Sequence, residues 1–390
     1  MFFKRSLLST AILAASFQAS ADAGMVESLS DFNVNETSFM KRAGLEVGLW
    51  ASGGVTGNSN GKTNAPVLFN DRVNEFTLDQ LNFYIERAVD TEGDSWDIGG
   101  RMDFMYGTDA RFTQASGWDD KWNAGSSGYY DIAMPQLYVE VFAPIGNGIT
   151  AKLGHFYTSI GNEVVTAPDN FFYSHAYTML YAEPFTHTGA TFSYDIDDNF
   201  SVNAGAVMGW DNMTDNAGAW SFIGGGSWTS DDQASSVTVQ LISGDGDDGI
   251  DYNNDGEGDG NLGNRTMYSL VATHDFTDKL HYLFQHDFGT QEDMNGNGVN
   301  WFGVNQYVTY DINDELAIGV RAEWFNDVDS ARVSNMGANY FAASIGVNYS
   351  PLPWFKVRPE IRYDWADENV FNGGVDHDQV AIAMDMILTF

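Results

Sequence analysis

The chain has 390 residues, with 54 Asp and Glu against 18 Lys and Arg, and a formal net charge of −36 at pH 7. Nucleic acid and anionic lipid headgroups repel such an acidic protein, so neither is expected as its main partner. The chain has no cysteine, which excludes disulfides and thiolate metal sites, and its 14% aromatic content does not fit a disordered chain.

Residues 1–23 are expected to be a secretory signal peptide. Lys4 and Arg5 precede the apolar run "LLSTAILAASF", and small residues at 19–23 offer a cleavage site. The apolar run is too short for a permanent transmembrane helix. The next segment, 24–43, shows no clean period.

From residue 44 onward the main signal is a period of two, which is typical of β-strands. In "WFKVRPEIRYDW", residues 354–365, apolar residues such as Val357 and Ile361 alternate with ionic residues such as Arg358 and Glu360. One face of the segment is therefore apolar and the opposite face is charged. The same alternation occurs in 95–106, 200–210, 315–325 and 379–390.

Short and long connections alternate along the rest of the chain. Short polar turns are predicted at 90–94, 144–148, 195–199, 230–233, 276–279, 313–315 and 351–353. Longer loops are predicted at 52–75, 107–131, 159–183, 211–217, 244–263, 290–299, 327–339 and 366–376. This alternation predicts an all-β fold over 44–390, a transmembrane antiparallel β-barrel of about 16 strands with both ends of the barrel on the short-turn side.

The barrel prediction carries an orientation and a location. Bacterial outer-membrane barrels have short periplasmic turns and long extracellular loops, and aromatic residues near both interfaces. The charged face of each strand is then expected to line the interior, and the apolar face is expected to contact lipid. The sequence leaves open whether segment 24–43 lies in the periplasm or folds into the lumen.

Two strands are predicted to be irregular. Pro359 lacks the N–H group that a closed ladder needs, which predicts a bulge or a locally broken pair. The second strand changes phase between Leu78 and Leu81, which predicts a bulge.

The third long loop and its flanks carry a set of short motifs. They are Gly154, Phe156 and Thr158, then Gly161 and Glu163, then Pro168, Asn170, Tyr173 and Ser174, then "PFTHTG" at 184–189. With these motifs the chain resembles the β-barrel porin family described as OmpL-like. The resemblance implies a passive channel in the bacterial outer membrane. It does not identify the solute that the channel carries.

Loop 159–183 is the candidate constriction, because a barrel of this size needs something to narrow its lumen if small solutes are to be discriminated. The alternative is an outer loop whose aromatic residues contact lipopolysaccharide. The candidate constriction residues are Glu163, Asp169, Asn170, Tyr173, Tyr181 and Glu183.

Charged residues on the inferred inner face are the candidate pore lining. They could set up a field across the pore, or pair with each other and only keep the wall wet. Ion preference stays open, because acidic outer loops attract cations whereas a basic wall attracts anions. The candidate pore-lining residues are Arg101, Asp103, Glu140, Lys152, Arg321, Glu323, Lys356, Arg358, Glu360 and Arg362.

A cofactor is not required by any motif, and calcium is the one metal that the sequence suggests. The loop "DYNNDGEGDGN" has the early spacing of an EF-hand but lacks the bidentate Glu at position twelve, so a weak site and a solvated turn both stay open. A weaker copy begins at Asp293. The candidate calcium ligands are Asp251, Asn253, Asp255 and Asp259.

Alternative functions and partners complete the predictions. A surface or structural barrel stiffened by calcium is one alternative, and an outer-membrane hydrolase using Ser174 and His175 is a weaker one, because Ser174 does not lie in a G-x-S-x-G motif and no zinc H-E-x-x-H motif occurs. The neighbouring His155 and His187 do not by themselves predict a metal site. The expected partners are outer-membrane lipid, lipopolysaccharide and small hydrophilic solutes, and assembly as a homotrimer stays open.

Overall fold

The computed structural model forms a closed barrel of sixteen antiparallel strands, in which each strand pairs with its neighbours in sequence and β1 pairs with β16. It describes residues 24–122, 128–213, 220–245, 263–292, 297–333 and 337–390. The strands are β1 (Glu46–Asn58), β2 (Phe76–Arg87), β3 (Asp97–Gly107), β4 (Asp131–Ala143), β5 (Ile149–Tyr157), β6 (Thr186–Asp195), β7 (Phe200–Val207), β8 (Ser221–Thr229), β9 (Ser235–Asp245), β10 (Asn264–Thr277), β11 (Leu280–Glu292), β12 (Gly298–Asn313), β13 (Leu316–Asp327), β14 (Ala338–Leu352), β15 (Phe355–Ala366) and β16 (Asp378–Thr389). The predicted all-β, antiparallel barrel of sixteen strands is confirmed.

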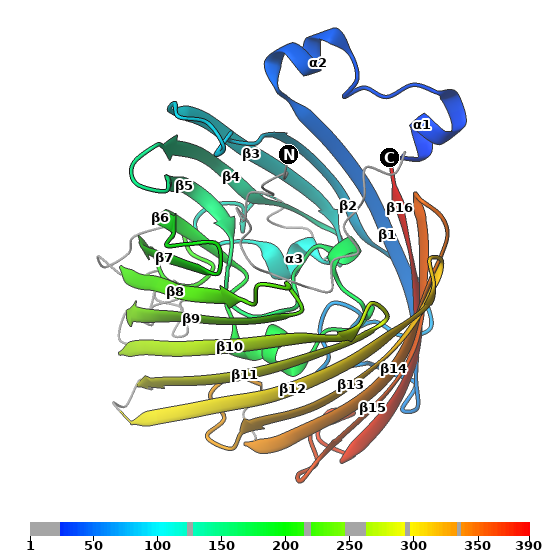
Figure 1. Ribbon diagram of the computed structural model, residues 1–390. Coiled ribbons are helices and arrows are strands. Elements are labelled where there is room, and N and C mark those ends of the chain that lie inside the picture. Colours follow the sequence, from blue (N-terminus) through cyan, green and yellow to red (C-terminus); the bar gives the residue numbers. More distant parts are fainter. Residues whose placement is uncertain (1–23, 123–127, 214–219, 246–262, 293–296, 334–336) are drawn as a thin grey trace.

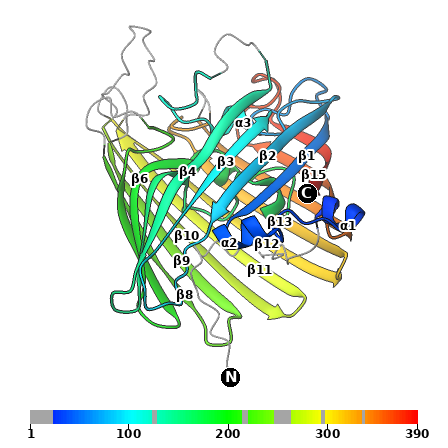
Figure 2. The ribbon, with the colours of Figure 1, turned by 90° about the horizontal axis from the view of Figure 1, so that it is seen from above.

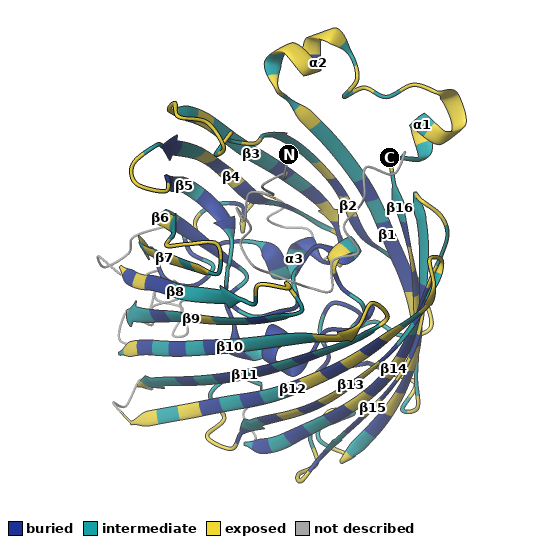
Figure 3. Cartoon of the chain, viewed as in Figure 1, coloured by how far each residue is buried: buried dark blue, intermediate teal, exposed yellow. Residues whose placement is uncertain are grey.

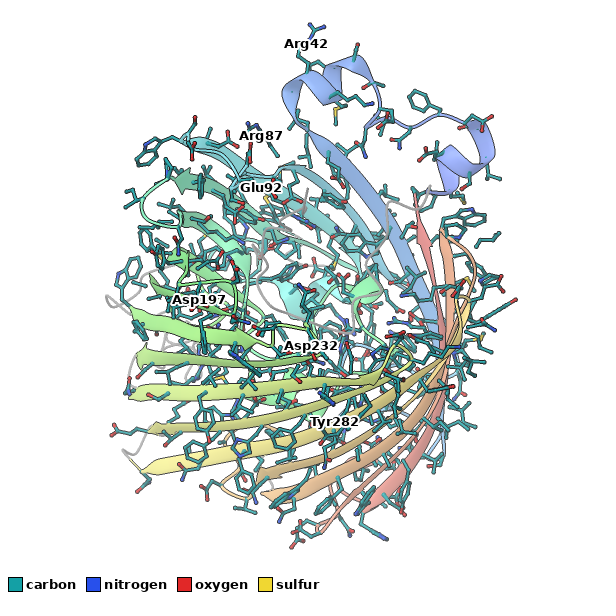
Figure 4. The ribbon with its side chains drawn as sticks, viewed as in Figure 1. Arg42, Arg87, Glu92, Asp197, Asp232 and Tyr282 are labelled. Carbon is teal, nitrogen blue, oxygen red and sulfur yellow. The ribbon has the colours of Figure 1, made fainter. Side chains whose placement is uncertain are left out.

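Three short helices and two further helical turns accompany the barrel. The helices are α1 (Met25–Ser30), α2 (Ser38–Ala43) and α3 (Ala110–Thr113), and the turns are Ala167–Asp169 and Thr178–Ala182. Figure 1 shows α1 and α2 outside the barrel, Figure 2 shows α1 at its edge, and Figure 4 shows Arg42 directed away from it. Of the two places left open for segment 24–43, the structure therefore shows the one outside the lumen. The described residues contain no helix of the length and apolarity needed to cross a membrane.

The two faces of the strands differ as the period of two predicts, and Figure 3 shows the resulting bands along the strands. On β15 the outward Ile361 is 50% exposed, whereas the inward Arg362 is 1% exposed. Apolar side chains on the outer face of a barrel in water would be costly, but in a membrane they contact lipid. The inward face is polar, and its buried part lies around the connection between β5 and β6.

Outward aromatic side chains form a continuous row across β12 to β15. Trp324 contacts Phe302 with ring centroids 4.9 Å apart, and Phe341 and Trp365 stack at 5.4 Å. Amphipathic rings of this kind are typical of the interface between hydrocarbon and headgroups. The row therefore marks one edge of the membrane-facing band.

Both predicted irregularities are present. β1 and β2 change register between Ser52 and Gly53, which leaves Asp79 as the bulged residue of β2. Pairing of β14 with β15 is interrupted beside Pro359, between the Gly346–Glu360 and Tyr349–Val357 pairs. The register is the same on both sides of the gap, so Pro359 breaks the pair locally without a bulge.

The start of the first long loop was placed too early at residue 52. β1 continues to Asn58, paired with both β2 and β16. The segment "ASGGVTGN" lacks an apolar and polar alternation because small residues dominate it, so its strand character comes from the neighbouring strands rather than from its own side chains.

Candidate functional site in the lumen

The connection between β5 and β6, residues 158–185, folds into the barrel and is called loop 3 below. Its aromatic side chains lie over inward glycines of the wall. A Cβ atom added at Gly319 would be 2.4 Å from the Phe171 ring, so the missing side chain makes room for that ring. The inward glycines and the loop residues above them are Gly54 with Tyr173, Gly303 with Thr178, Gly319 with Phe171 and Gly346 with Phe172.

Arg321 on β13 holds the middle of loop 3. Its Nη1 atom donates to Glu163 Oε1 and to the Ser174 carbonyl, each at 2.7 Å, and its Nε donates to Glu323 Oε1 at 2.7 Å. The Arg321 side chain is fully buried. A buried guanidinium with carboxylate and carbonyl acceptors satisfies its donors and fixes their partners.

Arg358 on β15 holds the first half of loop 3. Its Nη1 atom donates to the carbonyl oxygens of Ala167, Asn170 and Phe172 at 2.9, 2.6 and 3.1 Å. Asp385 on β16 accepts from Nε and Nη2 of the same guanidinium at 2.9 and 2.6 Å. One arginine therefore binds three carbonyl oxygens of the loop at once.

Arg362 and its neighbours hold the second half. Arg362 Nη1 donates to the His175 carbonyl at 2.7 Å, and Nε donates to Asp364 Oδ1 at 2.8 Å. Tyr177 donates its hydroxyl to the same Asp364 oxygen at 2.9 Å and its N–H to Glu323 at 2.8 Å. The loop backbone thus accepts a hydrogen bond from a basic residue of the wall, Arg362, and donates one to an acidic residue, Glu323.

Loop 3 also contacts β2, on the other side of the β1–β16 pair that closes the barrel. Gln80 donates to the Val165 carbonyl at 2.6 Å and accepts from the Ala167 N–H at 3.0 Å. The Tyr173 hydroxyl donates to the bulged Asp79 at 3.0 Å. The bulge in β2 therefore places a carboxylate where loop 3 needs an acceptor.

Two loop carboxylates differ in charge state. Burial alone would raise the pKa of Glu163, but Arg321 and His175 outweigh burial and lower it to about 2. Burial, together with the nearby Asp287, raises the pKa of Glu183 well above its usual value. Glu163 is therefore an anion paired with Arg321, whereas the protonated form of Glu183 is favoured.

Loop 3 leaves uncovered the wall made of β3 to β5, together with the end of β2 that carries Glu86. Arg101 Nε donates to Asp103 at 2.6 Å and Nη1 to Glu86 at 3.0 Å, and Lys152 lies 3.3 Å from Glu140. The Arg101 side chain keeps 20% of its surface exposed. These ion pairs are in contact with the lumen.

A cavity of about 510 Å³ lies between loop 3 and the uncovered parts of the wall. It is lined by loop 3 from Asn162 to Phe171, and by side chains of the surrounding strands. The lining side chains that carry or can carry charge are Arg101, Glu163, Asp169, Glu183, Asp275, His281, Asp311 and Lys356.

The structure separates the candidate pore-lining residues into two groups. Arg321, Glu323, Arg358, Glu360 and Arg362 face inward, but loop 3 covers them, so they contact the loop rather than open water. The expectation that these five line the pore is corrected, because the loop occupies the space in front of them. Arg101, Asp103, Glu140, Lys152 and Lys356 lie outside this covered patch, although Asp103 is itself buried beside Arg101.

The candidate constriction residues also separate by exposure. Asp169 is exposed and lines the cavity together with Asn170, Glu163 and Glu183. Tyr173 is buried against Asp79, and Tyr181 packs in the aromatic cluster beside Phe325 with ring centroids 6.5 Å apart. The two tyrosines therefore support the loop and do not contact the cavity.

Sequence reasoning missed several lumenal residues. Gln80 and Asp79 sit at the bulge of β2, and His281 lies between Asp275, at 2.7 Å, and Asp311, at 3.2 Å. Asp385, the partner of Arg358, had a usable signal, because it is the one charge inside the otherwise apolar segment 380–390. The roles of Asp79, Gln80 and His281 depend on where loop 3 lies in the barrel, and the sequence does not give that position.

The remaining candidate sites do not form a metal site in the described part of the chain. His155 contacts Thr188 at 2.8 Å, and the Nε2 atom of His187 contacts Thr158 at 2.9 Å. No group of His, Asp or Glu in the described residues is arranged to hold a metal ion. The candidate calcium ligands Asp251, Asn253, Asp255 and Asp259 lie outside the described residues.

Comparisons with known proteins agree with this architecture. Residues 44–390 match the model of the family described as "Putative beta-barrel porin-2, OmpL-like". The chain belongs to this family. The porin is thus an outer-membrane channel built on a sixteen-strand barrel. A search of curated proteins found no match.

Solved structures share the fold of the porin at low sequence identity. An anion-selective porin from Comamonas acidovorans has a TM-score of 0.61 at 10% identity, over 89% of this chain and 99% of that one. OprB of Pseudomonas putida has a TM-score of 0.62 at 13% identity, over 95% and 99%. OmpT of Vibrio cholerae, in its trimer form, has a TM-score of 0.55 at 12% identity, over 89% and 99%.

Proposed function

We propose that loop 3 is the constriction of this porin and that small hydrophilic solutes pass between it and the walls of β3 to β5 and β9 to β12. The supporting observation is the anchoring of loop 3 by Arg321, Arg358 and Arg362 on one side and by Gln80 on the other. A loop held at both ends and in its middle narrows the lumen without closing it. The cavity beside it is the remaining path.

Thiol labelling tests this role directly, because the chain has no cysteine of its own. The Asp169→Cys variant, reconstituted in a planar bilayer, is expected to lose about half or more of its single-channel conductance when a charged, water-soluble thiol reagent is added. Glu92→Cys is the matched control, because Glu92 lies exposed in the turn between β2 and β3 (Figure 4).

Equal responses of the two variants would contradict a constriction at loop 3. No response of either variant, with normal conductance before the reagent, would contradict it as well.

The porin is further proposed to have no hydrolase activity at Ser174 and His175. The Ser174 hydroxyl donates to Glu360, and the Nδ1 atom of His175 lies 3.2 Å from Glu163. A nucleophilic serine needs a base that accepts its proton. Here a carboxylate of the wall holds the serine and a different carboxylate holds the histidine, which supports a structural role for both.

We also propose that three barrels associate through the outer face of β6 to β8. Cross-strand pairs on this face bring Ala190 next to Ala206 and Ala204 next to Gly224, between the exposed rings of Phe192 and Phe222. Small side chains allow close approach of two barrels in lipid. The variant Ala204→Trp is expected to shift a cross-linked trimer to monomer in detergent, whereas Val320→Trp, on the outer face of β13, is expected to leave the trimer unchanged.

Two predictions stay as they were made from the sequence. Residues 1–23 are proposed to be removed as a signal peptide, and mass spectrometry of the purified porin would locate the mature N-terminus. A weak calcium site in the loop between β9 and β10 is tested by calorimetric titration of the intact porin.

A further inference from the structure

The ion preference of the passage follows from which charges loop 3 covers and which it leaves in contact with the cavity. We propose that the porin carries small cations in preference to anions, with Asp169, Asp275 and Asp311 as the residues that set this preference. The inference rests on the proposed function, because it assumes that solutes pass through the cavity beside loop 3.

Three arginines on the inner wall of the barrel could attract anions if they were accessible. Arg321, Arg358 and Arg362 are 1 to 2% exposed. Loop carbonyls and carboxylates of the wall, including Glu323 and Asp385, accept from all three guanidinium groups. The Nη2 atom of Arg362 has no hydrogen-bond partner among the described residues, but it is buried. A guanidinium that is paired in this way, and which water does not reach, does not bind a passing anion. These three arginines of β13 and β15 therefore hold the loop.

Arg101 and Lys356 are the Arg and Lys residues that line the cavity in the described part of the chain. Arg101 is paired with two carboxylates, Asp103 and Glu86. Lys356 donates to the carbonyl of Pro168 at 3.1 Å and faces the same cavity as Asp169. Both positive charges are thus accompanied by at least as much negative charge within the lumen.

Three carboxylates in contact with the cavity keep part of their surface exposed. Asp169 and Asp275 are exposed, and the Asp311 side chain keeps 32% of its surface. Asp169 sits on loop 3, whereas Asp275 and Asp311 lie near the short turns that follow β10 and β12. The passage therefore meets carboxylates at the loop and again towards its periplasmic end.

His281 stands between two of these carboxylates, with Nδ1 2.7 Å from Asp275 and Nε2 3.2 Å from Asp311. Even a protonated His281 leaves this group with one net negative charge. Glu163 and Glu183 also line the cavity, but Arg321 balances the charge of Glu163, and burial favours the protonated form of Glu183. Neither is needed for the inference.

Neutral oxygen atoms in the cavity wall point to the same class of solute. Asn162 and Asn348 line the cavity, and their side-chain oxygens are buried without a hydrogen-bond partner among the described residues. These residues are 8% and 3% exposed. Buried amide oxygens are acceptors that suit a cation or an ammonium group, and they offer nothing to an anion.

The reversal potential of the reconstituted porin tests the inference. In a planar bilayer with a KCl gradient of about tenfold, we expect a K⁺/Cl⁻ permeability ratio of roughly 3 or more. The triple variant Asp169→Asn, Asp275→Asn, Asp311→Asn is expected to bring the ratio close to one at an unchanged circular dichroism spectrum.

A control with the same change in net charge separates the passage from the overall field. The variant Glu92→Gln, Asp198→Asn, Asp314→Asn neutralises three exposed carboxylates in the short turns and is expected to keep the ratio of the native porin. An equal fall in both triple variants, or a native ratio of one or less, would overturn the inference and leave the channel itself standing. Absence of conductance steps in the native porin would overturn the proposed function and the inference together.

Discussion

The covered wall of β13 to β16 and the open wall of β3 to β5 carry the same kinds of charged residue and use them differently. On both walls, basic and acidic residues occur together on the inward face. On the covered wall the Arg321 side chain is fully buried and binds loop 3, whereas on the open wall Arg101 stays 20% exposed and pairs with its strand neighbours. An inward charged residue that loop 3 covers binds the loop, whereas one that the loop leaves uncovered faces the water of the lumen.

The physical basis of the difference is the solvent around each pair. Charges next to water are screened, so an exposed ion pair contributes little to stability. A buried charge that loses its partner is costly, because water cannot replace the lost interaction. The same substitution should therefore have unequal effects on the two walls, and four experiments test this.

The largest effect is expected for Arg321→Gln. The substitution leaves Glu163 and Glu323 without their shared guanidinium, and breaking a buried pair costs about 3 to 5 kcal/mol. Urea unfolding of the porin in detergent, followed by tryptophan fluorescence, measures the loss. Arg101→Gln is the control, with an expected loss several times smaller, and equal losses would refute the distinction between the walls.

Acid should release loop 3 through Glu163. Because the pKa of Glu163 in the folded porin lies near 2, below its usual value of about 4.5, its stabilising contribution is present above pH 4.5 and is lost as the pH falls towards 2. The loss is on the order of 3 kcal/mol. Single-channel recordings between pH 5 and pH 2 should show rising current noise.

The Glu163→Gln variant is the control for that titration. Its recordings should be noisy already at pH 5 and should change less with acid. A native porin and a variant with identical pH profiles would show that another group holds the loop.

A side chain added at one of the inward glycines under loop 3 should destabilise the loop, by less than the loss of Arg321. In Gly319→Ala the new Cβ atom meets the Phe171 ring at 2.4 Å, and overpacking of this kind costs about 1 to 3 kcal/mol. In Gly57→Ala the nearest atom is 3.8 Å away, so no loss is expected. Proteolysis of loop 3 in the folded porin, measured for both variants, distinguishes a displaced loop from an undisturbed one.

The smallest effect is expected for Lys152→Met on the open wall. Its pair with Glu140 at 3.3 Å is partly exposed, so its loss costs less than about 1 kcal/mol. Thermal unfolding in detergent should change little, while the conductance responds because a lumenal charge is removed. A large loss of stability would place Lys152 among the anchors and weaken the comparison.

The strand pattern could be predicted because it depends on local rules. The alternation around Ile361 and Arg362 appears in the sequence, since each strand must show one face to lipid and one to the interior. Pro359 and the phase change after Leu78 were also readable, because a missing N–H and an extra residue disturb any ladder. The part of β1 after Ser52 could not be predicted, because its small residues show no alternation of apolar and polar side chains.

The position of loop 3 could be anticipated only in part. The motifs around Glu163 marked the segment, but its contacts with Arg321, Gln80 and Gly319 join residues that lie far apart in the chain. No local rule pairs such residues. Whether a charged residue faces water or the loop was therefore not decidable from its strand.

The sequence by itself determined the barrel of this porin, its strand number and the inward direction of its charges, because these depend on the period of two and on the turns between strands. The tertiary structure alone decided which of those charges meet water. Loop 3 covers Arg321, Arg358 and Arg362 and leaves Asp169, Asp275 and Asp311 in contact with the cavity. The physical reason is that covering depends on how a loop packs across the lumen, and that packing depends on shape and charge contributed by several distant strands at once.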